Sequence, residues 1–304
     1  AVRVRGMSVF RIGTRQSRLA LVQAAIAAEA LRPVTGDIST VTLNTHGDAI
    51  SARQPNGRWV ATDGQFTREL ERALLGGAVD LVVHSYKDLP TDPVPGLVIG
   101  AVLERGDPRD CLLTRGGGEL ADLPFGARIG TSSPRRAAQL AAARSDLIAM
   151  PIRGNVESRL RRLEAGELDG LVLAAAGLDR LGVQVPANAR LSLDLMLPAP
   201  AQGALALQVR ADDARLLGLV AGIEHVPTRV AVEAERRLLR RIGGGCLAPL
   251  GALGEVDGDR LRLRAAYETA GGTQIRAEAY GSAADPDEVV AEVAALIERE
   301  AVVA

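Results

Sequence analysis

The sequence predicts an α/β protein that ends in a small α+β domain. Over most of the chain, short runs of β-forming residues alternate with helical stretches, which is typical of α/β folds. From Arg229 onward, two strands of alternating polarity instead lie between two helices. A chain of 304 residues is also long enough for two or more domains.

Hydrophobic periodicity and capping residues place the individual elements. Ser17 stands near the start of the first helix, and Asn155 and Gly166 are typical start and stop residues of another helix. The predicted strands cover residues 9–13, 39–44, 80–84, 97–103, 168–174, 260–269 and 274–281, and residues 128–130 lead into a loop. The predicted helices cover residues 17–31, 66–75, 134–144, 155–165, 229–242 and 287–300.

The composition argues against several classes of protein. Hydrophobic residues make up 47% of the chain and charged residues 24%, so long disordered segments are not expected. No run of eighteen apolar residues occurs, and residues 1–11 lack the apolar run of a signal peptide. A formal net charge of −1 provides no basic field for nucleic acid or a membrane surface. We therefore expect a cytoplasmic protein that binds neither.

The cysteines do not form a recognisable metal or disulfide pattern. Cys111 and Cys246 lie far apart in the sequence, without a CxxC motif or a nearby histidine pair, so we expect no metal site. Cys111 stands in an apolar stretch and reads as an inert core residue. Cys246 ends a glycine run that leaves its thiol uncovered, which fits either a functional thiol or a merely tolerated one.

The chain contains one lysine, Lys87, beside 35 arginines. A genome bias toward arginine explains most of this ratio, but not the lysine that remains. Lysine is a compact ammonium whose pKa can be tuned, whereas arginine is a fixed-charge fork. Lys87 and its neighbour Asp88 follow a predicted buried strand, where α/β proteins place chemistry. The pair is therefore a candidate catalytic site, although neighbours of opposite charge more often form a surface ion pair.

Arginines stand at the starts of three predicted helices, where the helix dipole makes a cation unfavourable. Backbone N–H groups, hydroxyl groups and guanidinium groups together form an anion site, so these starts predict a ligand with several carboxylates or phosphates. Carboxylates are favoured because no phosphate-binding glycine motif occurs. The alternative is that an arginine-rich chain carries arginines everywhere. The residues at these starts are Arg15 and Ser17; Ser132, Ser133, Arg135 and Arg136; and Arg153 and Arg159.

Taken together, these segments resemble the porphobilinogen deaminase (hydroxymethylbilane synthase) family. Any one of the motifs would be weak alone, but their order and spacing run from about Phe10 to the C-terminal helix. The motifs are RIGTRQS (11–17), HSYKDLP (84–90), GTSSPRR (130–136), RGNV (153–156), AAGLDRLG (175–182), PAQG (200–203) and GGC (244–246).

The resemblance implies three domains. Domains 1 and 2 would be similar to the two lobes of periplasmic binding proteins, and the chain would cross between them twice. The stretches 107–108 and 197–200 are candidate linkers. The implied boundaries are 1–103 with 200–221 for domain 1, 108–197 for domain 2 and 226–304 for domain 3, which would carry Cys246 on a loop.

The resemblance also implies a reaction of tetrapyrrole (heme) biosynthesis. Four porphobilinogen molecules would condense head to tail with release of ammonia, and hydrolysis would free linear hydroxymethylbilane. The growing chain would be primed by a dipyrromethane cofactor, bound to Cys246 through a thioether. Asp88 would take an acid–base and electrostatic role, and Lys87 would contact a cofactor carboxylate.

The resemblance implies that the enzyme would work as a monomer. Further residues of the implied cleft follow from the same motifs. Bidentate arginines suit the acetate and propionate groups of each pyrrole ring. Phe66 would cover the cofactor. The other implied binding residues are Arg15, Ser17, Ser85, Thr131, Ser132, Ser133, Arg135, Arg136, Arg153, Gly154, Arg159 and Arg180.

Two other interpretations stay open. A two-lobed carboxylate-binding module without chemistry would use an arginine-lined cleft equally well. A deaminase paralogue with impaired turnover is the second, because Asp63 stands where many family members have a lysine before Gly-x-Phe. The stretch 52–64 is polar and has no clear periodicity, so we expect a mobile lid on which Asp63 contacts no substrate carboxylate.

Overall fold

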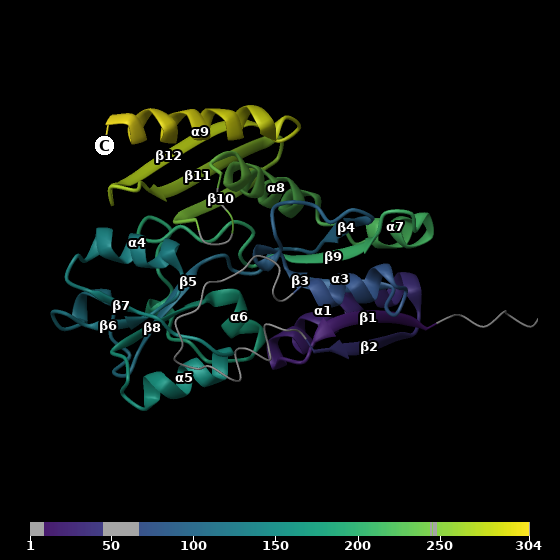
Figure 1. Ribbon diagram of the computed structural model, residues 1–304, viewed down its shortest axis with the longest axis horizontal. Helices are drawn as coiled ribbons and strands as arrows, with labels where there is room; N and C mark the ends of the chain where they lie inside the picture. The colour runs from purple at the N-terminus through teal and green to yellow at the C-terminus, as the bar shows by residue number, and fades with distance from the viewer. Residues whose placement is uncertain (1–8, 45–66, 244, 246–247, 304) are drawn as a thin grey trace, which may run out of the picture.

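The computed structural model describes residues 9–44, 67–243, 245 and 248–303. Within these residues the chain forms three β-sheets with helices packed against them (Figure 1). Two sheets have the mixed parallel and antiparallel pairing of α/β domains, and the third is an antiparallel meander. The predicted α/β class with a small α+β domain at the C-terminus is confirmed.

The first sheet has the strand order β2-β1-β3-β9-β4. Strand β1 pairs in parallel with β2 and β3, whereas β9 runs antiparallel to β3 and β4. The strands are β1 (Phe10–Arg15), β2 (Ile38–Leu43), β3 (Leu81–Ser85), β4 (Leu97–Val102) and β9 (Leu205–Arg210). The helices that accompany this sheet are α1 (Arg18–Thr35), α3 (Arg68–Leu75) and α7 (Ala214–Ala221).

The second sheet has the order β5-β8-β6-β7, with β5 antiparallel to β8 and the other pairs parallel. Its strands are β5 (Asp110–Thr114), β6 (Arg128–Gly130), β7 (Ile148–Met150) and β8 (Gly170–Ala174). Its helices are α4 (Pro134–Ala143), α5 (Val156–Glu164) and α6 (Ala175–Arg180). Short 3-10 turns occur at Leu120–Asp122 and Ala187–Ala189.

The chain passes from the first sheet to the second after β4 and returns before β9. The two crossing segments touch, because Gly106 N donates a hydrogen bond to Gly203 O (3.2 Å). A Cβ on Gly203 would lie 2.5 Å from Gly106 O, and Gly203 has a φ of +91°, so the contact requires glycine. The stretches predicted as linkers, 107–108 and 197–200, lie in these two segments.

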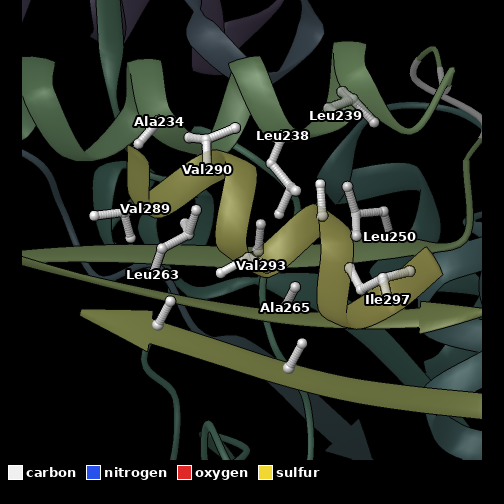
Figure 2. Close-up of a cluster of buried hydrophobic side chains, with 14 of the residues drawn as sticks. Ala234, Leu238, Leu239, Leu250, Leu263, Ala265, Val289, Val290, Val293 and Ile297 are labelled. Atoms are coloured by element: carbon white, nitrogen blue, oxygen red, sulfur yellow. The ribbon is translucent and has the colours of Figure 1, made fainter. Parts of the chain in front are cut away.

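The third sheet has its own hydrophobic core. Strands β10 (Leu250–Asp257), β11 (Arg260–Glu268) and β12 (Gln274–Ser282) pair antiparallel, and helices α8 (Val226–Arg241) and α9 (Pro286–Val303) pack against them. Figure 2 shows aliphatic side chains of α8 and α9, among them Leu238 and Val293, pointing toward those of the sheet, such as Leu263. Helix α8 also contacts β4 of the first sheet.

The predicted helix starts at Ser17 and Asn155 are confirmed, and Ser133 is a further N-cap. The three residues occupy the N-cap positions of α1, α5 and α4, and each side chain accepts a backbone hydrogen bond from the first turn. These contacts join residues only three positions apart, so the local sequence specifies them.

Several strands are absent from the predicted elements, and β10 shows the reason best. Gly251 and Gly254 weaken its strand pattern, yet each lies against backbone. A Cβ on Gly251 would be 2.8 Å from Leu197 O, and one on Gly254 would be 2.7 Å from Ala231 O. The glycines therefore permit close packing within a strand. Strands β5, β7 and β9 are also missing from the prediction. No helix of the described residues has the length and apolarity needed to cross a membrane.

Candidate active site

The Lys87–Asp88 pair lies on a 3-10 turn, η1 (Tyr86–Asp88), directly after β3. Tyr86 and Leu89 are 2% and 4% exposed and belong to one buried cluster, whereas Asp88 is exposed. The turn therefore anchors one side in the core and presents its carboxylate to solvent. This placement at the end of a central strand agrees with the prediction from the sequence.

His84, on the same strand, is buried. Its Nε2 lies 3.0 Å from Gln208 Oε1, a side-chain hydrogen bond between β3 and β9. The pKa of His84 is lowered to about 4, chiefly by burial, with the hydrogen bond to Gln208 opposing this shift and the charge of Arg15 adding to it. His84 is thus a neutral packing residue at neutral pH.

Lys87 reaches across to the crossing segments. Its ammonium group donates a hydrogen bond to Gln202 Oε1 (3.1 Å), and Gln202 Nε2 donates to Pro108 O (2.7 Å) and Asp110 Oδ1 (3.0 Å). Burial lowers the pKa of Lys87 to about 8, although the nearby carboxylates of Asp88 and Asp110 oppose this shift. The ammonium group of Lys87 therefore loses its proton more readily than that of an exposed lysine.

A buried carboxylate, Asp110, holds the two arginines at the start of α4. Its Oδ2 lies 2.8 Å from Arg135 Nη1, and its Oδ1 lies 2.7 Å from Arg136 Nη2. Asp110 is fully buried, and Arg135 and Arg136 are 3% and 7% exposed. Burial alone would raise the pKa of Asp110, but the two arginines hold it well below its usual range.

Arg135 and Arg136 already have an anion within the protein. Two cations in a first helical turn predict a ligand anion, but Asp110 supplies that negative charge. Arg135 Nη1 also donates to Leu197 O (2.7 Å), and Arg136 Nη1 donates to Val172 O (3.0 Å). Both arginines therefore have a structural role, and their contact with a cofactor remains a prediction.

Arg159 of α5 and Arg180 of α6 have no such carboxylate among the described residues. Arg159 Nε donates to Gly154 O (2.8 Å), and Arg180 Nη2 donates to Gly203 O (2.6 Å), and no ion pair joins either one to an acid among the described residues. Burial lowers the pKa of Arg159 to about 10, and the charges of Arg136 and Arg153 add to this effect. Burial likewise lowers the pKa of Arg180 to about 10 and lowers that of Arg153. Arg159 and Arg180 are therefore suited to an external anion.

The hydroxyl side chains at the start of α4 and at the end of β3 make hydrogen bonds within the protein. Ser132 Oγ donates to Ile152 O (2.8 Å) and accepts from Ile152 N (2.9 Å), which ties the start of α4 to the segment before α5. Thr131 Oγ1 accepts from Ser133 N (3.2 Å), and Ser85 Oγ accepts from Gln23 Nε2 (2.8 Å). Gly154, with a φ of +96°, could not carry a Cβ, because it would collide with Ser158 Oγ.

The structure brings part of the predicted site together directly. Electrostatic interactions connect Arg159 with Asp88, Arg136 and Arg153, and connect Lys87 with Asp110. The turn after β3 and the starts of α4 and α5 thus lie near one another, although they belong to different sheets. We refer to Lys87, Asp88, Arg136, Arg153 and Arg159 as the cationic centre. Asp110 and Gln202 contact this centre but have no role in the sequence prediction. Gln202 lies in the PAQG motif, which is a signal that could have found it.

Three predicted residues, Cys246, Phe66 and Asp63, lie outside the described residues. Cys111, by contrast, is fully buried, and burial raises the pKa of its thiol to about 11. This agrees with its prediction as an inert core residue. Among the described residues, no group of three or more histidine, cysteine and acidic side chains could hold a metal ion.

Comparison with known proteins shows which family this chain resembles in sequence. Residues 10–218 match the family described as "Porphobilinogen deaminase, dipyromethane cofactor binding domain", and residues 230–299 match "Porphobilinogen deaminase, C-terminal domain". A porphobilinogen deaminase of Desulforudis audaxviator is 49% identical over 279 residues, covering 91% of this chain and 90% of the relative. One of Acidothermus cellulolyticus is 47% identical over 294 residues, covering 95% and 88%.

Solved structures give a more distant likeness. The periplasmic aliphatic sulphonate binding protein SsuA from Escherichia coli is 16% identical, with 77% of this chain and 70% of that chain covered and a TM-score of 0.40. The first family match covers the first and second sheets, whose elements carry the cationic centre, and the second match covers the third sheet. The chain therefore belongs to the porphobilinogen deaminase family.

Proposed function

We propose that this protein is a hydroxymethylbilane synthase, a transferase of tetrapyrrole and heme biosynthesis. It condenses four porphobilinogen molecules into linear hydroxymethylbilane and releases ammonia, starting from a covalently bound dipyrromethane. The observation that carries the proposal is the group of arginines and Lys87 around the exposed carboxylate of Asp88, in a chain of this family.

The described residues fit a dipyrromethane. Each of its two pyrrole rings carries an acetate and a propionate, so the group needs several cations. Arg159 and Arg180 are buried enough for their pKa values to fall to about 10, and neither is paired with a carboxylate among the described residues. A bound polyanion would reverse that shift and stabilise the charged guanidinium groups. These two arginines are therefore suited to hold it.

The other residues that we propose for the cleft come from the family motifs. We propose that Cys246 carries the cofactor through a thioether and that Phe66 covers it. The remaining proposed contacts with cofactor and substrate are Arg15, Ser17, Ser85, Lys87, Thr131, Ser132, Ser133, Arg135, Arg136, Arg153, Gly154 and Arg180, together with Arg159.

Asp88 is the residue that we propose for the chemical step. When bound, the dipyrromethane supplies the pyrrole position at which each new unit is joined. The exposed carboxylate of Asp88 can accept hydrogen bonds from pyrrole N–H groups, hold a proton for the departing amine and stabilise positive charge on the pyrrole nitrogen. The buried Tyr86 and Leu89 on either side fix the turn, so the carboxylate is positioned before substrate arrives.

Lys87 has a different proposed role. Its ammonium group already contacts Gln202, so it lies between the two crossing segments and the cofactor site. A cofactor carboxylate beside it would favour the charged ammonium and raise its pKa from the value of about 8 in the unliganded protein. Lys87 would thus orient the cofactor rather than transfer protons.

We also propose the division into domains that the resemblance implies, in a monomeric cytoplasmic enzyme that binds neither nucleic acid nor membrane. The crossing segments that meet at Gly106 and Gly203 support a boundary between domains 1 and 2. The separate core between the third sheet and helices α8 and α9 supports domain 3.

The intact mass of the purified protein tests the proposed cofactor. After incubation with porphobilinogen, the wild-type protein should be heavier than its sequence by one dipyrromethane. Cys246→Ser should lose the added mass, whereas the matched control Cys111→Ser should keep it. An unmodified wild-type protein, or added mass that persists in Cys246→Ser, would contradict the proposal.

A further inference from the structure

A cavity of about 270 Å³ lies behind the turn that carries Lys87 and Asp88. Tyr86 and Leu89 line it, together with residues of β4 and α8, whereas Lys87 and Asp88 do not. The cavity is therefore separate from the cationic centre. Its wall includes a buried acid, an apolar middle and an arginine rim. Arg229, Glu233 and Arg236 also line it, but Arg229 pairs with Glu224 and Glu233, and Arg236 donates hydrogen bonds to backbone carbonyl groups.

The buried acid is Glu71 of α3, which is 7% exposed. Its carboxyl group has hydrogen bonds with Gln208 and Thr67, but its Oε1 has no hydrogen-bond partner among the described residues. Burial raises the pKa of Glu71, and the hydrogen bonds with Gln208 and Thr67 and the charge of Arg68 offset this shift only in part. A buried carboxyl oxygen without a partner is costly, so a hydrogen-bond donor or cation from a ligand would be favourable there.

The apolar middle comes from three segments. Leu97 and Ile99 of β4 lie on one side, and Leu89 and Pro90 of the following loop also line the cavity. Tyr86 contributes its ring, and its hydroxyl already donates to Glu233 (2.6 Å). This part of the wall is complementary to an apolar group of a ligand and provides few polar contacts for it.

The rim carries Arg237 and Arg240 of α8. Arg237 pairs with Asp287, whose side chain is 73% exposed. Arg240 Nε lies 3.8 Å from Oδ1 of Asp92, whose side chain is 90% exposed. Such exposed pairs contribute little stability, so a carboxylate could replace either partner at small cost. Two neighbouring arginines on one face of a helix suit a carboxylate, which binds guanidinium groups through two oxygens.

We propose that this cavity binds a small zwitterion, with a primary ammonium group on Glu71, an apolar body against Leu97 and Ile99, and a carboxylate on Arg237 and Arg240. The negative group at the base and the positive groups at the rim fix the orientation of the ligand. The proposal goes beyond the proposed function and does not depend on it.

Binding to the full-length protein tests this. The probes are 4-(aminomethyl)benzoate and the longer 3-[4-(aminomethyl)phenyl]propionate, which cover two distances between the charges. Two half-probes lack one group each: 4-methylbenzoate lacks the ammonium and benzylamine lacks the carboxylate. Isothermal titration calorimetry should show that at least one zwitterion binds about tenfold more tightly than either half-probe, because each end makes a charge-assisted contact.

Matched variants locate the probe. Glu71→Gln should reduce the affinity of the zwitterion to that of 4-methylbenzoate, whereas Glu69→Gln, on the same helix but not lining the cavity, should not. Arg240→Gln should lower the affinity about tenfold, whereas Arg241→Gln should not. If Glu71→Gln does not fold, the affinities of the half-probes and the zwitterions for the wild-type protein still test whether both charged groups contribute to binding.

Three results would overturn the proposal. The first is that neither zwitterion binds more tightly than the half-probes. The second is that Glu71→Gln, folded as judged by its melting temperature, binds the zwitterion as the wild type does. The third is that the affinity falls in Arg159→Leu but not in Glu71→Gln, because the probe would then occupy the cationic centre. None of these results depends on enzyme activity, so the proposed function could fail separately.

Discussion

Asp110 and Arg136 form an ion pair in the interior of the protein, with Oδ1 and Nη2 2.7 Å apart. The pair joins the first residue of β5 to the first turn of α4, and the same carboxylate also holds Arg135 and Gln202. Because Gln202 contacts Lys87, one buried carboxylate connects the helix start in the second sheet with the turn that carries Asp88. The geometry of the proposed active site therefore depends on Asp110.

Replacing Asp110 by Asn should destabilise the protein strongly. The substitution keeps the shape but leaves two buried guanidinium groups without their carboxylate, and breaking a buried pair in this way costs about 3–5 kcal/mol. The free energy of unfolding in urea measures the effect. The control is Glu278→Gln, which removes an exposed pair with Arg262 and should cost less than about 1 kcal/mol. Equal stability losses in the two variants would show that Asp110 is not the central counter-ion.

Arg159 and Arg135 should respond differently to replacement by leucine. Arg159→Leu removes a partly buried cation that has no carboxylate among the described residues, so folding should change by no more than about 1 kcal/mol. Cofactor assembly should nevertheless be hindered. Arg135→Leu should impair assembly and also lower the free energy of unfolding by about 3–5 kcal/mol, because Asp110 loses a buried partner.

Intact mass and urea unfolding, measured on both variants, separate these effects. If a ligand anion were the only partner of Arg135 and Arg136, replacing either residue would leave folding largely intact, but the ion pairs with Asp110 argue against that. If Arg135→Leu is as stable as the wild type, the buried pair contributes less than the structure indicates. If Arg159→Leu assembles normally, Arg159 is not a cofactor contact.

Local features could be predicted from the sequence, and long-range partners could not. Ser133 and Asn155 are recognisable as N-caps because their hydrogen-bond partners are three residues away. Asp110 lies 26 positions before Arg136, and only the pairing of β5 with β8 brings it under α4. For the same reason the sequence correctly places cations at this helix start, but it cannot show that one buried aspartate neutralises two of them.

His84 should make the protein less stable in mild acid. The pKa of His84 is about 4 in the folded protein and about 6.5 in an unfolded chain, so the unfolded state binds more protons between these values. Stability should therefore rise with pH from about 4 to 6.5, and this one group would contribute about 3 kcal/mol over that range. His84→Gln should flatten the rise, as measured by urea unfolding at pH 4.5 and 7. An equally steep rise in the variant would assign the effect to other groups.

Two substitutions distinguish the roles of Asp88. Asp88→Asn keeps the shape but cannot neutralise charge, whereas Asp88→Glu keeps the charge and moves it by one methylene group. If charge stabilisation dominates, Asn should lose far more activity than Glu, because one preorganised electrostatic group typically contributes a factor of about 10²–10³ in rate. Holoprotein should still form slowly in the Glu variant. Both variants are compared by hydroxymethylbilane formation at matched holoprotein content. Equal activity of the Asn and Glu variants would make Asp88 a positioning residue.

We propose that this protein polymerises porphobilinogen and does not merely bind it. The most direct measurement follows ammonia and hydroxymethylbilane together after purified holoprotein is mixed with porphobilinogen. The protein should steadily release about four ammonia molecules for each linear tetrapyrrole, and the Cys246→Ser variant, which lacks the proposed attachment site, should not turn over. Binding of porphobilinogen without release of ammonia would contradict the proposal.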